Sequence, residues 1–220
     1  MKENVQMEID AESCTGLWYT NIAKTPEEAE KEYDRVSSFY DRMLAARDYR
    51  VPEDASKLLA ELIDPASAGK VLDAGCGTGL LGVRLREKGF KDITGMDISA
   101  NCLVEAEKKN AYTRTVKQNI LEPFPFAERS FDVVVCVGVF SRFDDQQIMA
   151  ILDEFARITR QGGMILFSKR TDLLANSMLL DKISKSEKFR LHFISEPYQY
   201  IPGDAHYKDV FIKYFALIAA

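Results

Sequence analysis

One carboxylate stands directly before three closely spaced glycines in the sequence VLDAGCGTG at residues 71–79. Val71 and Leu72 form the short apolar run expected of a buried parallel strand, so Asp73 falls at the carboxyl end of that strand. The glycines let the backbone approach a ligand closely. A pyrophosphate site offers amide N–H groups and a helix N-terminus, and a carboxylate beside them would repel that ligand. Asp73 therefore predicts a ligand that carries positive charge.

The glycine spacing separates this turn from the common phosphate-binding motifs. Gly75, Gly77 and Gly79 are spaced G-x-G-x-G, whereas the dinucleotide fingerprint is G-x-G-x-x-G. No P-loop sequence occurs in the chain. The alternative is a plain turn between a strand and the helix expected at 80–88. The adjoining strand and helix favour a ligand-binding turn, and the ammonium and sulfonium groups of S-adenosylmethionine (SAM) supply a suitable positive charge.

Further polar side chains are expected at the ends of neighbouring strands, where ligands bind in open α/β sheets. Asp97 ends the second predicted strand and can accept two hydrogen bonds from a ribose diol. The alternative is a helix cap, although Ser99 is the better cap for the next helix. Asn119 and Ile120 can offer adenine a side-chain oxygen and an apolar face, although Asn119 alone is typical of a turn. Gly138 permits close approach to the methionyl part.

The elements that must position these residues alternate along the chain. Strands are predicted at residues 70–74, 92–97, 113–117, 131–138 and 163–168. Helices fill the gaps, and the helix at 145–159 has the clearest apolar face. The alternation predicts a Rossmann-like, doubly wound, mostly parallel α/β sheet with helices on both faces. After a helix around 173–186, the segments 189–201 and 209–218 predict a C-terminal antiparallel hairpin that closes the sheet.

Two further helices are predicted before the sheet. The sequence TPEE at 25–28 begins the first with an N-cap, a proline at the first helical position and a capping-box glutamate. The second begins near Pro52 and carries leucines and alanines at helical spacing. Residues 1–24 are polar and aperiodic, and we expect a flexible leader there.

The run 70–170 resembles the class I SAM-dependent methyltransferase family. Family motifs match, in chain order, DAGCGTG at 73–79, NILEPFPF at 119–126, FDVV at 131–134 and RQGG at 160–163. The family's ribose-binding acid falls on Asp97, and Asn119 replaces the usual adenine-side aspartate. The resemblance implies SAM as the cofactor, S-adenosylhomocysteine (SAH) as its product, and a SAM-binding methyltransferase domain at 65–220.

The N-terminal part narrows the resemblance. The Tyr-Asp, Ser, Tyr-Asp pattern at 33–41 is similar to a helix of small-molecule members in which the second tyrosine closes over the cofactor. That comparison gives Tyr40 this role and makes 25–64 an N-terminal helical lid, with ordinary amphipathic packing as the alternative. YRVP at 49–52 resembles the methyltransferase-like group of the Williams–Beuren region. Arg50 thereby becomes a candidate partner for the cofactor's carboxylate.

The expected site draws on the lid and on several strand ends. Its candidate cofactor-binding residues are Tyr40, Arg50, Asp73, Gly75, Cys76, Gly77, Gly79, Leu80, Asp97, Ile98, Asn119, Ile120 and Val137. Candidates for lining the acceptor pocket are Phe140, Arg170, Tyr198 and Tyr200. The sequence identifies no catalytic base and no metal site.

SAM carries an activated methyl group, so the protein must mainly hold the acceptor in line with the S–CH₃ bond and exclude water. The leading interpretation is methyl transfer to a small-molecule acceptor by in-line displacement. One alternative is a protein side-chain methyltransferase, which needs an open peptide groove. Another is a non-catalytic SAM-binding module that acts through a partner. GVFS at 138–141 stands where methyltransferases of DNA adenine carry NPPY or DPPY.

Composition narrows the class of protein further. With 220 residues, 46% of them hydrophobic, the chain can build one α/β core with a modest appendage. No apolar run reaches the ~20 residues of a membrane span, and residues 1–10 lack a signal-peptide core. The net charge of −5 argues against a nucleic-acid substrate. The four cysteines lack C-x-x-C pairing, which favours reduced thiols in a cytoplasmic protein over disulfides or a zinc site.

Overall fold

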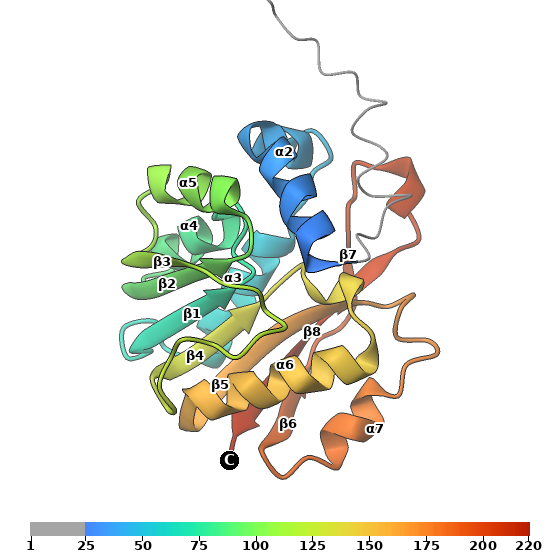
Figure 1. The fold of residues 1–220 in the computed structure, drawn as a ribbon. Helices are drawn as coiled ribbons and strands as arrows, with labels where there is room; N and C mark the ends of the chain where they lie inside the picture. Colours follow the sequence, from blue (N-terminus) through green and yellow to red (C-terminus); the bar gives the residue numbers. More distant parts are fainter. Residues whose placement is uncertain (1–24) are drawn as a thin grey trace, which may run out of the picture.

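The computed structural model describes residues 25–220, so the expected leader at 1–24 lies outside the described residues. Two N-terminal helices precede a run of alternating strands and helices (Figure 1). The elements are α2 (Pro26–Ala45), α3 (Val51–Leu62), β1 (Lys70–Ala74), α4 (Leu80–Glu87), β2 (Asp92–Asp97), α5 (Ala100–Lys108), β3 (Arg114–Lys117), β4 (Phe131–Cys136), η1 (Phe140–Arg142), α6 (Asp145–Ile158), β5 (Thr159–Arg170), α7 (Leu179–Ser184), β6 (Phe189–Ile194), β7 (Tyr198–Gln199), η2 (Ala205–Tyr207) and β8 (Phe211–Ala219).

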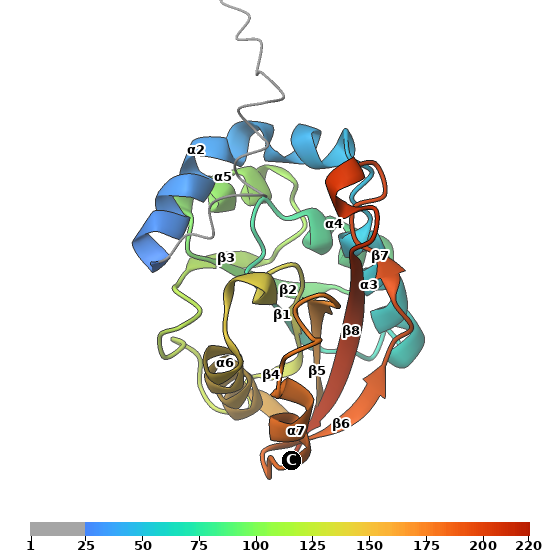
Figure 2. The same cartoon turned by 90° about the vertical axis from the view of Figure 1, so that its right-hand side faces the viewer.

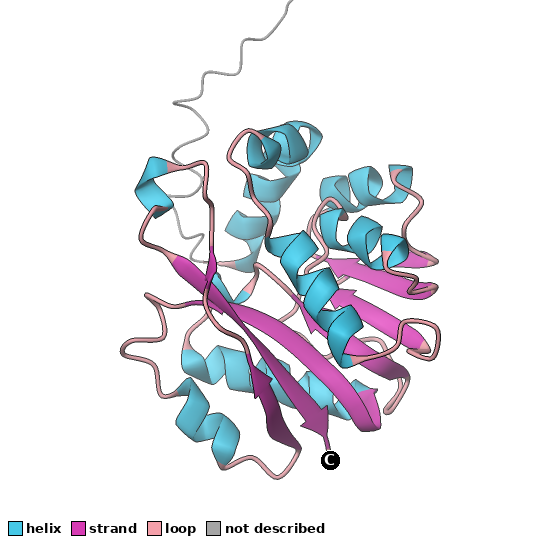
Figure 3. Ribbon diagram, turned by 180° about the vertical axis from the view of Figure 1, so that it is seen from behind, coloured by secondary structure: helices cyan, strands magenta, loops and turns pink. Residues whose placement is uncertain are grey.

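In the described part of the chain, eight strands form one sheet in the order β3-β2-β1-β4-β5-β8-β6, with β7 also paired to β8. Strands β1 to β5 are parallel, whereas β8 runs antiparallel to β5, β6 and β7. Helices α3 and α4 cover one face, and α6 and α7 cover the other (Figure 2, Figure 3). The expected Rossmann-like, mostly parallel sheet is therefore confirmed.

Alternate side chains of the central strand β4 serve the two faces of the sheet. Val133 and Val135 pack on the side of α3 and α4, while Val134 and Cys136 pack on the side of α6. This follows from the two-residue period of a strand, and a strand covered on both faces is apolar along its buried part. Each fully buried side chain of this kind stabilises the fold by about 1.5–3 kcal/mol.

Capping groups define where α2 and α6 begin. The side chain of Thr25 accepts a hydrogen bond from the Glu28 amide in a capping box, as the sequence predicts. Asp144 accepts from the amides of Gln146 and Gln147 and starts α6 in the same way. Such a cap is worth about 1 kcal/mol. Helix α2 lies beside α5, above the sheet in Figure 1.

The C-terminal part differs from the sequence expectation in two ways. The helix expected at 173–186 is limited to α7, because Asp145 accepts hydrogen bonds from the Ser177 hydroxyl and the Met178 amide and holds the preceding residues as turns. The segment 189–201 forms two strands, since Pro197 lacks an amide for the ladder. Both strands pair with β8, so the antiparallel hairpin is confirmed in an interrupted form.

Candidate functional site

A cavity of about 430 Å³ lies between α2 and the ends of β1, β2 and β4. The strand order reverses between β1 and β4, and ligands of open α/β sheets bind at such a switch point. The volume is within the usual range for a small-molecule site. Asp73, Asp97 and Val137 line it from the strand ends, and Tyr33 and Tyr40 line it from α2.

The glycine turn after β1 brings bare backbone to the cavity wall. Gly75 has a φ of +78°, and a Cβ there would stand 2.5 Å from Cγ2 of Val139. The amides of Gly75 and Cys76 both donate to the carbonyl of Met96, at 2.7 and 3.0 Å. The turn is thereby tied to β2. Only glycine combines this conformation with this clearance.

Asp97 holds the same turn from the end of β2. Its Oδ2 accepts from the Gly77 amide at 2.8 Å, and its Oδ1 accepts from the Ser99 amide at 2.9 Å. Burial raises the pKa of Asp97, and these backbone hydrogen bonds oppose the rise. A carboxylate has about four acceptor positions, so edges remain for a ligand. Ser99 caps α5 by accepting from the Cys102 amide, as the sequence predicts.

Asp73 is buried, with 1% of its surface exposed. Burial raises its pKa to about 7; a hydrogen bond from the Tyr112 hydroxyl, at 2.7 Å, opposes the rise, and the charge of Asp97 adds to it. The ring of Tyr112 fits where Gly82 and Gly95 lack side chains, since a Cβ on either would crowd it. Sequence reasoning missed Tyr112. The sequence signal was Gly82 within a helix and Gly95 within a strand, because glycine at such positions often marks a close approach by another group.

Both aspartates of the Tyr-Asp pattern attach α2 to the core. Asp34 accepts from the Ser99 hydroxyl at 2.6 Å and from the Asn101 amide at 3.1 Å. Asp41 accepts from the Thr78 hydroxyl at 2.6 Å and pairs with Lys109 at 2.8 Å. These contacts turn the tyrosine-bearing face of α2 toward the cavity.

An arginine at the end of η1 connects α2 to the β4 side of the cavity. Arg142 Nε donates to the Tyr33 hydroxyl at 3.2 Å, and its guanidinium lies 5.0 Å from the centre of the Tyr33 ring. Nη2 lies 3.5 Å from the carboxylate of Glu32. Arg142 is not among the site residues expected from the sequence. Its only sequence signal was its place shortly after the fourth strand.

The loop after β3 forms the opposite end of the cavity. Asn119, Ile120 and Ile98 line it. Asn119 Oδ1 accepts from the Leu121 amide at 3.0 Å and its Nδ2 donates to Glu122 at 3.3 Å. Asn119 is thus both a turn residue and part of the cavity wall. The sequence had left open whether it is a turn residue or a residue that contacts the ligand.

All candidate cofactor residues except Arg50 and Gly79 line the cavity. The structure places Arg50 at the exposed start of α3, where it pairs with Asp48 at 2.8 Å. The Asp48 partner and the turn before α3 direct it away from the site. Gly79 caps α4 behind the wall, and a Cβ there would contact Tyr112.

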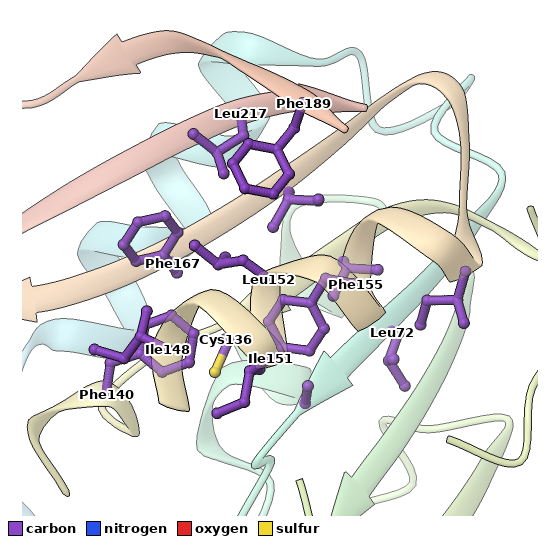
Figure 4. Close-up of a cluster of buried hydrophobic side chains, with 14 of the residues drawn as sticks. Leu72, Cys136, Phe140, Ile148, Ile151, Leu152, Phe155, Phe167, Phe189 and Leu217 are labelled. Carbon is purple, nitrogen blue, oxygen red and sulfur yellow. The ribbon is translucent and has the colours of Figure 1, made fainter. Parts of the chain in front are cut away.

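None of the four candidate acceptor residues lines this cavity. Phe140 is fully buried beneath α6 between Phe155 and Phe167 (Figure 4). The extended strand ends at Cys136, and the following 3₁₀ turn directs Phe140 into the core. The sequence expectation that Phe140 faces the acceptor pocket is therefore corrected.

The other three acceptor candidates cluster beside the cavity rather than in its wall. Arg170 pairs with Asp172 and lies over the ring of Tyr200, 5.5 Å from its centre. Tyr200 is buried against Tyr49, which does line the cavity. Tyr198 packs edge-on against a β8 ring, Tyr214. The reason is that β7 pairs with β8 and carries Tyr198, that Tyr200 directly follows β7, and that both tyrosines pack in the cluster on the α3 side of the sheet.

Two further features of the described residues bear on the site. Among them, no group of three or more His, Cys, Asp or Glu side chains is placed to hold a metal ion. Within the same part of the chain, no helix combines the length and apolar character needed to cross a membrane.

Comparison with known proteins adds to this geometry. Residues 71–163 match the family model of a methyltransferase domain. Methyltransferase-like protein 27 of Homo sapiens is 34% identical over 145 residues, which is 64% of this chain and 57% of that protein. The chain thus spans less than two thirds of this relative. The match agrees with the resemblance to the Williams–Beuren group.

Solved structures share the fold at low sequence identity. The cyclase SpnF superposes with a TM-score of 0.70 at 14% identity, covering 89% of this chain and 96% of that one. Magnesium protoporphyrin IX methyltransferase from Synechocystis PCC 6803, solved with bound SAH, has a TM-score of 0.63 at 16% identity and covers 89% and 99%. Residues 71–163 thus match a methyltransferase domain, and the fold and the glycine-turn cavity agree with the resemblance to class I SAM-dependent methyltransferases.

Proposed function

We propose that the chain is an enzyme that transfers the methyl group of SAM to a small-molecule acceptor by in-line displacement. One observation carries the proposal: Asp73 and Asp97 line a single cavity beside a glycine turn whose backbone faces that cavity. The donor set fits SAM, because carboxylates suit a cationic ligand and a ribose diol.

Each wall of the cavity has a proposed partner on the cofactor. Asp97 accepts from the ribose hydroxyls through its remaining acceptor positions, while Gly77 and Ser99 hold it in place. Asp73 faces the cationic methionyl part, and Tyr112 fixes its orientation. Ile98, together with the loop residues after β3, flanks adenine.

The proposed organisation is a helical lid at 25–64 over a SAM-binding domain at 65–220. Asp34 and Asp41 hold α2 against the core, so α2 covers one side of the cavity. A partly covered cavity of about 430 Å³ supports a small acceptor over a protein side chain. Cys76, Cys102 and Cys136 are unpaired thiols among the described residues, which supports a reducing, cytoplasmic location.

SAM, when bound, supplies a methyl group that needs no further activation. The chain's own residues bind and orient the reactants and exclude water beneath α2. Orientation of this kind can lower a barrier by about 7–11 kcal/mol. Burial raises the pKa of Tyr33 and raises that of Tyr40 well above the usual range, so both hydroxyls stay protonated in the cavity wall.

The fold alone does not decide which reaction, if any, the chain catalyses, since a cyclase shares it. The first test is therefore binding: titration calorimetry should detect SAH, and Asp97→Ala should weaken its binding by about 2–3 kcal/mol through lost charge-assisted hydrogen bonds. Thermal melting should also fall, because the Gly77 and Ser99 amides lose their acceptor. Asp153→Ala, on the exposed side of α6, is the matched control.

The second test is turnover with methyl-labelled SAM. Label should enter a small-molecule fraction of a metabolite extract and not a protein fraction. Label in protein would favour the side-chain alternative, and tight SAH binding without any labelled product would favour the binding module.

A further inference from the structure

Arg142 carries a donor that nothing in the described structure satisfies. Its Nη1 is buried and has no hydrogen-bond partner among the described residues. Its Nε and Nη2 are directed to Tyr33 and Glu32, and the residue lines the cavity. The guanidinium therefore presents one edge to α2 and leaves one buried donor next to the wall of the cavity.

Leaving such a donor unpaired is costly. A buried, unsatisfied polar group costs about 1–3 kcal/mol, and more when it is charged. Burial opposes the charge on Arg142, but Tyr33 and Glu32 outweigh this and raise its pKa, so the cation persists. The shape and charge of a guanidinium edge match a carboxylate.

The cavity separates its charges. Asp73 and Asp97 belong to the ends of β1 and β2, whereas Arg142 follows β4. Around Arg142 the wall is aromatic and apolar, with Tyr33, Val139 and Phe143. A ligand group that carries negative charge is thus expected next to Arg142, at the end of β4.

We propose that Arg142 Nη1 binds a carboxylate inside the cavity, at the β4 side beneath α2. Two carboxylates have this chemistry, that of an acidic methyl acceptor and that of the methionyl end of SAM. The proposal rests on the proposed function in taking the glycine-turn side as the nucleoside site. Because Nε of the same guanidinium holds Tyr33, the bound carboxylate also reinforces the closed position of α2.

The cofactor arm of the experiment compares SAH with 5′-methylthioadenosine, which lacks the amino-acid part. If the carboxylate is that of the cofactor, Arg142→Met weakens SAH binding by about 10-fold or more and leaves 5′-methylthioadenosine binding unchanged. Arg142→Lys keeps the charge and should lose less. Arg190→Met, on exposed β6, is the matched control and should match the wild type.

The acceptor arm compares benzoate with its neutral analogue benzamide, by ligand-detected NMR, with and without saturating SAH. If the carboxylate is that of the acceptor, the wild type binds benzoate in preference to benzamide, and Arg142→Met abolishes the preference. Tyr33→Phe removes the Nε partner but not Nη1, so it should retain the preference.

The inference is overturned if Arg142→Met changes neither the SAH to 5′-methylthioadenosine ratio nor the benzoate preference. It is also overturned if Tyr33→Phe reproduces every loss, because Arg142 would then act only by holding α2. Failure of the proposed function looks different: the wild type would bind no SAH, while the benzoate comparison without SAH would still report on Arg142.

Discussion

Lowering the pH through neutrality should weaken SAM binding through Asp73. In the free protein this buried carboxyl has a pKa of about 7, against an ordinary value of about 3.9. A bound cation favours the ionised form and lowers that pKa, so binding must release a proton wherever the free carboxyl is protonated. With a free pKa of 7 and a bound value of 5 or lower, the affinity at pH 5.5 should be about 20- to 25-fold lower than at pH 7.5, or about 2 kcal/mol.

Titration calorimetry in buffers of different ionisation enthalpy measures this proton directly. At pH 6.5 Asp73 should release about three quarters of a proton per SAM bound, and Asp73→Asn should remove that share. Tyr112→Phe removes a hydrogen bond that lowers the pKa of Asp73, so it should move the midpoint to higher pH. Burial raises the pKa of Asp97 as well, and Asp97→Asn measures its share of the release. Proton release as large in Asp73→Asn as in the wild type would refute the reasoning.

Three further outcomes are expected. The pKa of Asp73 in the folded state lies above its value in the unfolded state, so Asp73 destabilises the fold increasingly as the pH rises from about 4 to about 7. Asp73→Asn should therefore be up to about 4 kcal/mol more stable than the wild type at pH 8 and equally stable at pH 4. Thermal or urea unfolding measures this difference. Asp41→Ala removes the Thr78 and Lys109 contacts and should weaken SAH binding by about 10-fold in calorimetry, unless α2 is no lid, in which case affinity stays constant. Phe140→Ala should cost about 3–5 kcal/mol of stability by cavity formation, yet the folded variant should bind SAH normally; a selective loss of binding would return Phe140 to the site.

The strands and the glycine turn could be predicted from the sequence because local patterns specify them. β1 and β2 were predicted with their observed bounds, since a buried parallel strand is apolar and ends at a turn or a polar residue. The parallel arrangement of those strands follows from their alternation with helices. The strand ends then share one edge, which brings Asp73 and Asp97 together.

Contacts between distant segments were beyond the reach of local patterns. Phe140 and Arg142 are two residues apart, yet Phe140 is buried under α6 and Arg142 lines the cavity. Both belong to one 3₁₀ turn, which sends their side chains in different directions. Tyr112 becomes important only through the space left by Gly82 and Gly95. Arg50 pairs with Asp48, two residues away in the sequence, whereas the resemblance suggested the cofactor's carboxylate as its partner.

A crystal structure of the protein with SAH tests the central claim most directly. The account predicts the ribose hydroxyls within hydrogen-bond distance of Asp97, the ammonium beside Asp73, and the nucleoside against the glycine turn. A nucleoside bound in another cavity, or both carboxylates turned away from it, would contradict the account.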